Sequence, residues 1–121
     1  YSDPEFSWER TIVPTGLEFV NSELFDPYEN HLLVGACATG EILKFKLNED
    51  RTGFVFSSPH LQDLVANFIE TESGEKEFEP LDEIVFGDGF GCITDIKFGP
   101  DGFLYIVSIT DNSIYRIIPN S

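Results

Sequence analysis

The side chains in this chain that could bind a metal or take part in a reaction are two cysteines, two histidines and many carboxylates. Cys37 and Cys92 do not form a C-x-x-C motif, and His31 and His60 lack the spacing that would complete a zinc site with them. Each cysteine borders an apolar run, so the simpler expectation is a pair of buried free thiols. The alternative is a disulfide between neighbouring sheets, which would imply an oxidising compartment.

Acidic residues outnumber basic ones by 22 to 7, and the formal net charge is −15. Such a surface repels phosphate backbones and anionic lipid headgroups, so we expect neither nucleic-acid nor membrane binding. The charge acts mainly as a solubilising surface, with divalent-cation binding as the alternative. No EF-hand loop is present. The remaining candidates for cation binding are Asp88 together with Asp95, or Asp88 together with Asp111.

The other polar residues predict structural roles. No nucleophile elbow or Ser-His-acid arrangement is present, so no catalytic residue is assigned. His31 begins a predicted strand and His60 a predicted helix, which favours surface or capping positions. We expect Asp95 to hydrogen-bond the backbone or a neighbouring sheet. Trp8 is either a packing aromatic at a sheet end or a platform for a cofactor.

Length and composition indicate one domain. The 121 residues are 41% apolar and include 12 phenylalanines, which is too apolar for a disordered chain. No apolar run reaches the ~20 residues needed to span a bilayer, and no secretory signal is recognisable. The chain starts at Tyr1 without Met, so we expect a processed, trimmed or partial product.

Strand signals recur along most of the chain, separated by turn sequences such as Thr39-Gly40 and Gly99-Pro100-Asp101-Gly102. The first ten residues read as an extended arm or an edge strand. Apolar or alternating runs predict strands at residues 15–20, 31–38, 41–47, 54–57, 81–86, 93–98, 103–108 and 113–118.

One segment has a different period. Leu61, Leu64, Val65 and Phe68 fall at i, i+3, i+4 and i+7, which predicts a helix from Pro59. A charged loop follows. Helix and loop together predict an insertion over residues 59–79.

The remaining strands form an internal repeat. Thr15-Gly16-Leu17-Glu18-Phe19 matches Thr94-Asp95-Ile96-Lys97-Phe98 at an offset of 79 residues. Leu32-Leu33-Val34 matches Leu104-Tyr105-Ile106, and Ile42-Leu43-Lys44-Phe45 matches Ile114-Tyr115-Arg116-Ile117, both at an offset of 72. The longer loop of the first unit, at residues 21–30, explains the difference.

A repeated antiparallel meander is typical of a propeller blade. We therefore predict an all-β partial β-propeller of about two four-stranded blades, at residues 11–86 and 92–119, in one domain over 1–121. Repeat units need neighbours to bury their faces. The neighbours are either missing blades or further copies of this chain, and three two-blade chains would close a six-bladed ring.

The order of several motifs resembles the glucose/sorbosone dehydrogenase family. Residues 91–105, with the GPDG turn before Leu104-Tyr105, resemble its "RIRD-V-x-x-GPDG-x-LY" blade, and residues 113–117 its closing "G-x-I-x-R-I" strand. Trp8 with residues 13–19 resembles its "W-x-x-x-I-A-P-S/T-G-L-x-F" strand, and residues 32–36 its "LLVG-x-L-K" strand. The resemblance covers most of the chain outside the insertion and implies the C-terminal third of a six-bladed propeller.

The resemblance implies a quinone-dependent aldose sugar oxidoreductase that uses pyrroloquinoline quinone (PQQ) and calcium and acts outside the cytoplasm. The family's histidine base belongs to earlier blades, so this chain lacks a complete catalytic set. By family position the cofactor-binding residues are Trp8, Thr11, Cys92 and Thr94. Cys92 and Thr94 stand where the family has arginines, and Ala38 where it has a lysine. The alternative is a non-catalytic propeller module that binds a ligand or a protein.

Overall fold

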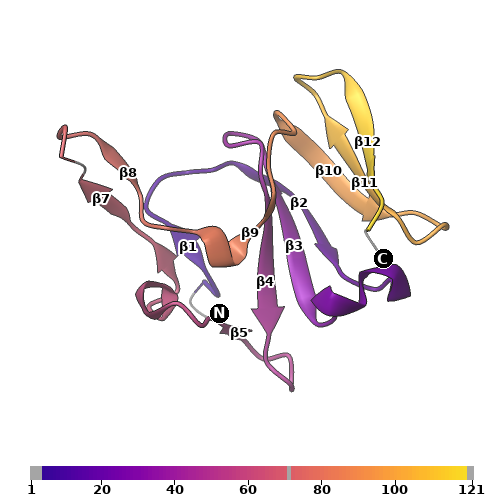
Figure 1. The fold of residues 1–121 in the computed structure, drawn as a ribbon, viewed down its shortest axis with the longest axis horizontal. Helices are drawn as coiled ribbons and strands as arrows, with labels where there is room; N and C mark the ends of the chain where they lie inside the picture. Colours follow the sequence, from indigo (N-terminus) through magenta and orange to yellow (C-terminus); the bar gives the residue numbers. More distant parts are fainter. Residues whose placement is uncertain (1–3, 71, 120–121) are drawn as a thin grey trace.

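The chain folds as two antiparallel sheets that lie side by side, with a separate hairpin at one end (Figure 1). The computed structural model describes residues 4–70 and 72–119. The strands are β1 (Ser7–Trp8), β2 (Pro14–Phe19), β3 (His31–Ala36), β4 (Ile42–Leu47), β5 (Phe54–Val55), β6 (Val65–Ala66), β7 (Phe68–Glu70), β8 (Lys76–Phe78), β9 (Val85–Gly87), β10 (Ile93–Phe98), β11 (Leu104–Ser108) and β12 (Ser113–Ile117). Three short 3₁₀ helices are η1 (Glu23–Tyr28), η2 (Pro59–Leu61) and η3 (Asp82–Ile84).

The first blade is the sheet β2-β3-β4, completed along the outer edge of β4 by two short strands. β5 pairs with Lys46 and Leu47, and β9 pairs with Ile42 and Leu43. The strand predicted at residues 81–86 therefore exists, but it begins only at Val85 because η3 precedes it. β3 is buried on both faces from Leu32 onward, as the sequence predicted for a strand between neighbouring layers.

The second blade is the sheet β10-β11-β12, and its register supports the internal repeat. The pairing of β2 with β3 shifts between Pro14 and Gly16. The pairing of β10 with β11 shifts between Ile93 and Asp95, which is the same place in the repeat. Both blades thus carry a β-bulge at equivalent threonines, Thr15 and Thr94. The all-β, propeller-like architecture is confirmed. In the described residues, however, the second blade has three strands and not the predicted four.

Apolar side chains from both blades form a shared core. Leu33 and Ile42 face Ile96 and Ile106 across the interface, and Phe25 of η1 closes one end at 2% exposure. A second core lies on the far face of the first blade, where Phe6, Trp8, Phe54, Phe56, Leu61 and Ile84 cover β3 and β4.

Polar side chains of the first blade bond to the backbone of the second. The Thr15 hydroxyl donates to the carbonyl of Ile93, and the Glu18 carboxylate accepts from the N–H of Phe98 at 3.1 Å. The backbones approach so closely that a Cβ on Gly16 would lie 3.1 Å from the nitrogen of Ile96. These contacts fix the register between β2 and β10.

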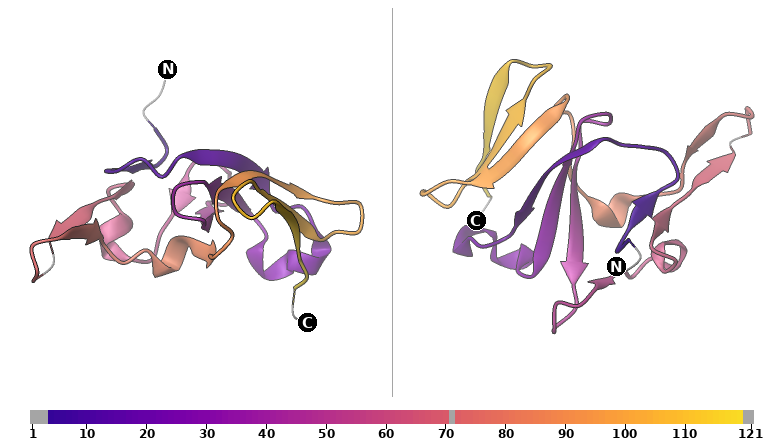
Figure 2. Two further views of the ribbon diagram at one scale, coloured as in Figure 1. Left: turned by 90° about the horizontal axis from the view of Figure 1, so that it is seen from above. Right: turned by 180° about the vertical axis from the view of Figure 1, so that it is seen from behind.

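The helix predicted from Pro59 is wrong beyond its first turn. Leu64 adopts a left-handed backbone with φ of 64°, and the Asp63 carboxylate accepts a hydrogen bond from the N–H of Val65 at 3.1 Å. β6 instead pairs in parallel with β1, and β7 pairs with β8. Tertiary pairing has overridden the helical periodicity. Residues 59–79 add no strand to either blade, and Figure 2 shows the β7–β8 hairpin projecting away from the second blade.

Candidate functional site

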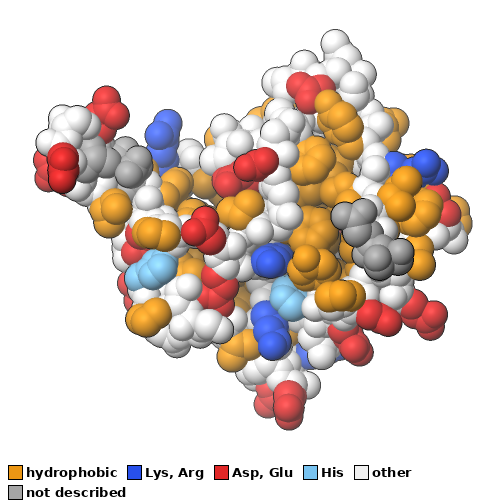
Figure 3. Space-filling view, in the orientation of Figure 1, with side chains coloured by type: hydrophobic (Ala, Val, Ile, Leu, Met, Phe, Trp, Pro, Cys, Tyr) orange, Lys and Arg blue, Asp and Glu red, His pale blue; other side chains and the backbone are white. Residues whose placement is uncertain are grey.

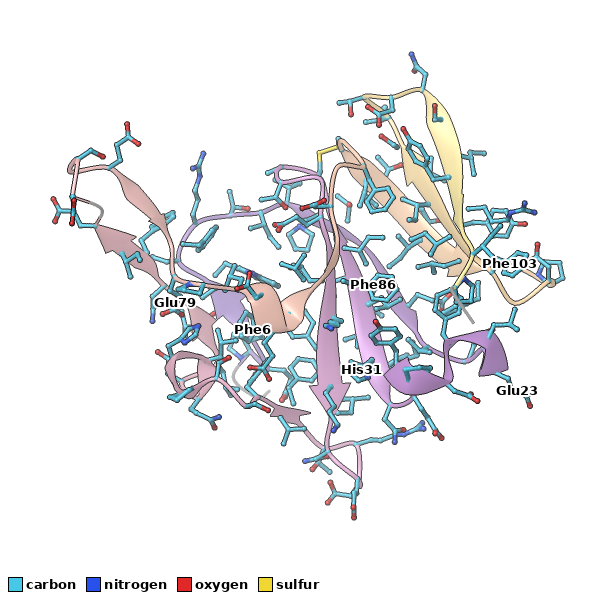
Figure 4. The ribbon with its side chains drawn as sticks, viewed as in Figure 1. Phe6, Glu23, His31, Glu79, Phe86 and Phe103 are labelled. Atoms are coloured by element: carbon cyan, nitrogen blue, oxygen red, sulfur yellow. A yellow bond between two sulfur atoms is a disulfide. The ribbon has the colours of Figure 1, made fainter. Side chains whose placement is uncertain are left out.

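A disulfide joins Cys37 to Cys92 and links the two blades at one end (Figure 4). The expectation of two free thiols is therefore wrong, and the disulfide alternative holds. Cys37 follows β3 and Cys92 precedes β10, so the folding of the repeat brings together residues 55 apart in the sequence. The Cys92 N–H also donates to the Thr110 hydroxyl at 2.9 Å, which anchors the loop before β10.

Two glycines sit beside this disulfide. Gly40 has φ of +70°, and a Cβ there would lie 3.0 Å from the nitrogen of Gly91. The carbonyl of Gly40 accepts a hydrogen bond from Phe90 at 3.1 Å. The turn after β3 and the glycine-rich segment before β10 therefore pack backbone against backbone, and only residues without a side chain permit that approach.

Thr11 lies at the same end of the first blade. The carbonyls of Ile12 and Val13 accept hydrogen bonds from Ala38 and Cys37 at 3.0 and 2.9 Å, which places this segment along the disulfide-bearing turn. Val13 has φ of +55°, an unusual backbone for a β-branched residue. The Thr11 hydroxyl accepts from the Val13 N–H at 3.3 Å and so helps to hold this bend.

A cavity of about 290 Å³ opens beside Thr11. Its walls combine one cation, two hydroxyls and two phenyl rings stacked with centroids 4.7 Å apart; they are Arg10, Thr11, Thr39, Phe68 and Phe78, together with Ile12 and Ala38. Within the described residues Arg10 makes no hydrogen bond or ion pair. The cavity can therefore offer a guanidinium and hydroxyls to a small polar ligand.

The sequence did not identify this cavity, because its walls come from three separate segments. In the sequence, Arg10 is one of several charged residues in the N-terminal arm, and nothing distinguishes it from the others. Phe68 belonged to a predicted helix, and pairing it with Phe78 required knowing the β7–β8 hairpin. The local signal for that hairpin is the charged loop at Gly74, which Phe68 and Phe78 flank on either side.

Trp8 lies away from this cavity, in the core of the first blade. Its ring makes edge-on contacts with Phe6 and Phe45 at 5.1 and 6.0 Å. The indole Nε1 is buried and has no hydrogen-bond partner among the described residues. The structure thus places Trp8 as a packing aromatic, apart from Thr11 and Cys92, which share one end of the blade pair.

Thr94 occupies the bulge of β10. Its hydroxyl donates to the carbonyl of Val107 at 3.4 Å, and its side chain is exposed. Because Cys92 is held in a disulfide and Thr94 bonds within its own sheet, neither supplies a charged donor. The residues present at the family's cofactor positions therefore do not fit a tricarboxylate quinone.

The acidic candidates for a cation site are engaged separately. Asp95 accepts from the N–H of Ile96 at 2.9 Å, so its expected backbone hydrogen bond is confirmed. Asp111 accepts from the Tyr115 hydroxyl at 2.7 Å, and this hydrogen bond raises the pKa of Tyr115. Across the described residues, no group of three or more His, Cys, Asp or Glu side chains is arranged to hold a metal ion.

A second, larger cavity of about 520 Å³ lies between the outer parts of the two blades. Its lining is mainly aromatic and aliphatic, including Tyr28, Phe86, Phe90 and Ile117, and Figure 3 shows hydrophobic side chains gathered in the hollow between the blades. It offers no charged side chain, in contrast to the cavity beside Thr11.

Comparison with known proteins points to the same family as the sequence motifs. Residues 1–117 match the family model described as glucose/sorbosone dehydrogenase. The chain is 26% identical over 110 residues to the aldose sugar dehydrogenase YliI of Escherichia coli strain K12. That alignment covers 91% of this chain but only 22% of YliI. No solved structure gives a significant match.

Proposed function

Since the chain belongs to the glucose/sorbosone dehydrogenase family, we propose that it is a two-blade structural portion of a quinone-dependent aldose sugar dehydrogenase propeller. In this role it supplies packed sheet and not catalytic groups. The observation that carries the proposal is the fate of Cys92, which stands at a family arginine position and is joined to Cys37 in a disulfide. By this proposal, a covalent connection between blades stands where the family has a cofactor contact.

The whole reaction, by this proposal, needs blades beyond these two. The general base that takes the sugar hydroxyl proton belongs to other blades of the family's ring. The family's cation positions within these two blades are occupied by Cys92, Thr94 and Ala38, so this chain supplies no cation there. The chain covers 22% of the length of YliI, which is consistent with a part of such an enzyme.

The proposal is tested by thermal unfolding with PQQ and calcium together, and with each alone. A ligand at 100 times its Kd stabilises the folded state by about 2.7 kcal/mol, which would raise the Tm by on the order of 10 °C. We expect no significant rise in Tm with the pair. A rise that requires both additives would contradict a purely structural role.

The cavity beside Thr11 favours a second candidate function, a module that binds a small ligand. Arg10 and the hydroxyls of Thr11 and Thr39 suit a polyhydroxylated ligand, and the rings of Phe68 and Phe78 provide an apolar wall. Titration calorimetry with glucose tests it. Under this alternative, heat of binding is present in the wild type and absent in Arg10→Ala.

We also propose an extracytoplasmic location. The disulfide supports it, because such bonds persist in oxidising compartments. In the described part of the chain, no helix has the length and apolar character needed to cross a membrane. Detection of the oxidised Cys37–Cys92 peptide in protein isolated with thiols blocked would agree with this location.

A further inference from the structure

We propose that a cavity on the outer part of the first blade binds a small oxyanion, a phosphate or the carboxylate of a small hydroxylated acid. This basic cavity measures about 190 Å³, and its polar walls are His31, Lys44 and Lys46 together with Glu83. The inference goes beyond the proposed function. It depends neither on PQQ nor on the cavity beside Thr11.

Sheet geometry gathers the three basic side chains at one place. Lys44 and Lys46 are two residues apart on β4, so their side chains stand on the same face of the strand. His31 of β3 is the direct cross-strand partner of Lys46. On the face shown in Figure 3, Lys or Arg side chains lie on either side of a histidine. A chain with only 7 Lys and Arg residues against 22 acidic ones thus places two lysines beside a histidine.

The remaining walls come from two other segments of the first blade. Val55 belongs to β5 and Phe56 follows it, while Glu83 and Ile84 belong to η3. All of these residues lie between positions 31 and 84. The cavity is therefore built within the first blade and does not depend on the second blade or on its open edge.

Both lysines are available to a ligand. The Nζ of Lys44 lies 5.3 Å from the centroid of the Tyr28 ring, a cation–π contact that holds this half-buried side chain in place. Lys46 is exposed. Among the described residues, neither lysine forms a hydrogen bond or an ion pair. Two like charges on one strand face repel each other, and an anion bound between them relieves that repulsion.

Glu83 does not neutralise the two lysines. Its Oε2 and Oε1 accept hydrogen bonds from the backbone N–H groups of Ser57 and Ser58 at 2.6 and 2.7 Å. With a neutral His31, the walls carry two positive charges and one negative charge, a net charge of +1. The N–H donors of both ammonium groups remain free for the oxygens of an anion.

His31 adds a hydrogen-bond acceptor. Its Nδ1 lies 3.2 Å from the carbonyl oxygen of Glu29, and because a carbonyl can only accept, Nδ1 carries the hydrogen. In the neutral imidazole, Nε2 is then the acceptor. The Tyr28 ring packs edge-on against His31 with centroids 5.7 Å apart and so restrains the imidazole. An acceptor beside two ammonium groups suits a ligand with a hydroxyl close to its anionic group.

Size and charge both select a small anion. A volume of about 190 Å³ equals roughly six waters at about 30 Å³ each. It lies below the ~300 Å³ at which pockets for drug-sized ligands begin. The net charge of −15 repels a polyanion that extends over the surface. At physiological salt, charges beyond about 8 Å are largely screened, so the nearby ammonium groups dominate for a small anion.

NMR titration of the ¹⁵N-labelled chain tests the proposal, with inorganic phosphate and gluconate as the two probes and sodium chloride at equal ionic strength as the reference. We expect saturable shifts of the amide signals of His31, Lys44 and Lys46 with at least one probe. Saturation by phosphate alone assigns a phosphate ligand, and saturation by gluconate alone assigns a hydroxylated carboxylate. Chloride and neutral glucose should leave these three signals without a saturable change.

Lys44→Gln and Lys46→Gln should each raise the Kd of the bound probe about tenfold, because each removes a charged hydrogen-bond donor. Lys97→Gln is the matched control. It removes the same charge, but Lys97 is exposed on β10 of the second blade, so the Kd should not change.

Circular dichroism verifies that the variants fold, and the exposed position of Lys46 makes its variant the safer of the two. The absence of a saturable change with both probes would overturn the proposal. An equal rise in Kd for Lys97→Gln would also overturn it, because the effect would then come from the overall charge and not from this cavity.

Discussion

The carboxylate of Glu18 accepts a hydrogen bond from the backbone N–H of Phe98 at 3.1 Å, across the boundary between the two blades. The two residues are 80 positions apart in the sequence and both belong to inner strands. With the hydroxyls of Thr15 and Ser22, which donate to backbone carbonyls of the second blade, Glu18 aligns β2 with the neighbouring blade.

Glu18→Ala should lower the free energy of unfolding by about 1–3 kcal/mol, because the partly buried N–H of Phe98 loses its acceptor. Glu18→Gln keeps an acceptor oxygen and should lose much less. Urea denaturation measures both. Glu49→Ala is the control, since Glu49 is exposed. Equal losses for Glu18→Ala and Glu49→Ala would mean that this contact does not hold the blades together.

The order of strands could be predicted from the sequence because its signals are local. The turn Gly99-Pro100-Asp101-Gly102 folds with a hydrogen bond from the N–H of Gly102 to the carbonyl of Gly99 at 3.0 Å. The strand predicted at residues 93–98 has the observed bounds of β10. Turn chemistry and alternation depend on a few adjacent residues, so one sequence is enough to read them.

The predictions that failed concern residues whose structure depends on partners far away in the sequence. Val65 entered a strand and not a helix because the arm at Ser7–Trp8 offers it a pairing edge. Cys37 formed a disulfide because the repeat brings Cys92 to it. The roles of Thr15 and Glu18 were also hidden, since each bonds to backbone about 80 residues away. The cavity beside Thr11 was not predicted for the same reason, since its walls come from segments that only the fold brings together.

Removing the disulfide should destabilise the protein by about 2–4 kcal/mol, because the bond closes a loop between residues 55 apart in the sequence. We expect the Cys37→Ser/Cys92→Ser protein to have a lower Tm than the oxidised wild type. A reductant should lower the Tm of the wild type to about the same value and leave the double variant unchanged. A wild-type Tm insensitive to complete reduction, verified by thiol labelling, would contradict the role of this bond in joining the blades.

Gly40→Ala should also destabilise the blade pair. The new Cβ would carry the strain of φ at +70° and would lie 3.0 Å from the nitrogen of Gly91. The next nearest atom is the Gly91 carbonyl oxygen at 3.1 Å, so both close contacts are with backbone. The clash can be relieved only if the two loops separate, and we expect the free energy of unfolding to fall by about 1–3 kcal/mol. Gly53→Ala is the matched control, since its nearest atom is the flexible Asn48 amide at 3.8 Å. Urea denaturation of the two variants should show a clear loss only for Gly40→Ala.

Glu83 should make stability depend on pH in the acidic range. Burial raises the pKa of this carboxyl, but hydrogen bonds from Ser58 and Ser57 outweigh it and leave the pKa below the ordinary value. The two backbone N–H groups donate at 2.7 and 2.6 Å, and they hold the start of η2 against η3.

The direction in which stability changes with pH follows from which state, folded or unfolded, binds the proton more tightly. With a depressed pKa in the folded state, the unfolded chain takes up the proton first as pH falls. The stabilisation from Glu83 is therefore fully present above the ordinary glutamate pKa and is lost as pH falls through the folded value. Glu83→Gln cannot ionise, so the Tm difference between wild type and this variant should shrink on acidification. Glu49→Gln should show a small difference at every pH, and a constant Tm difference for Glu83→Gln would exclude this carboxylate as the titrating group.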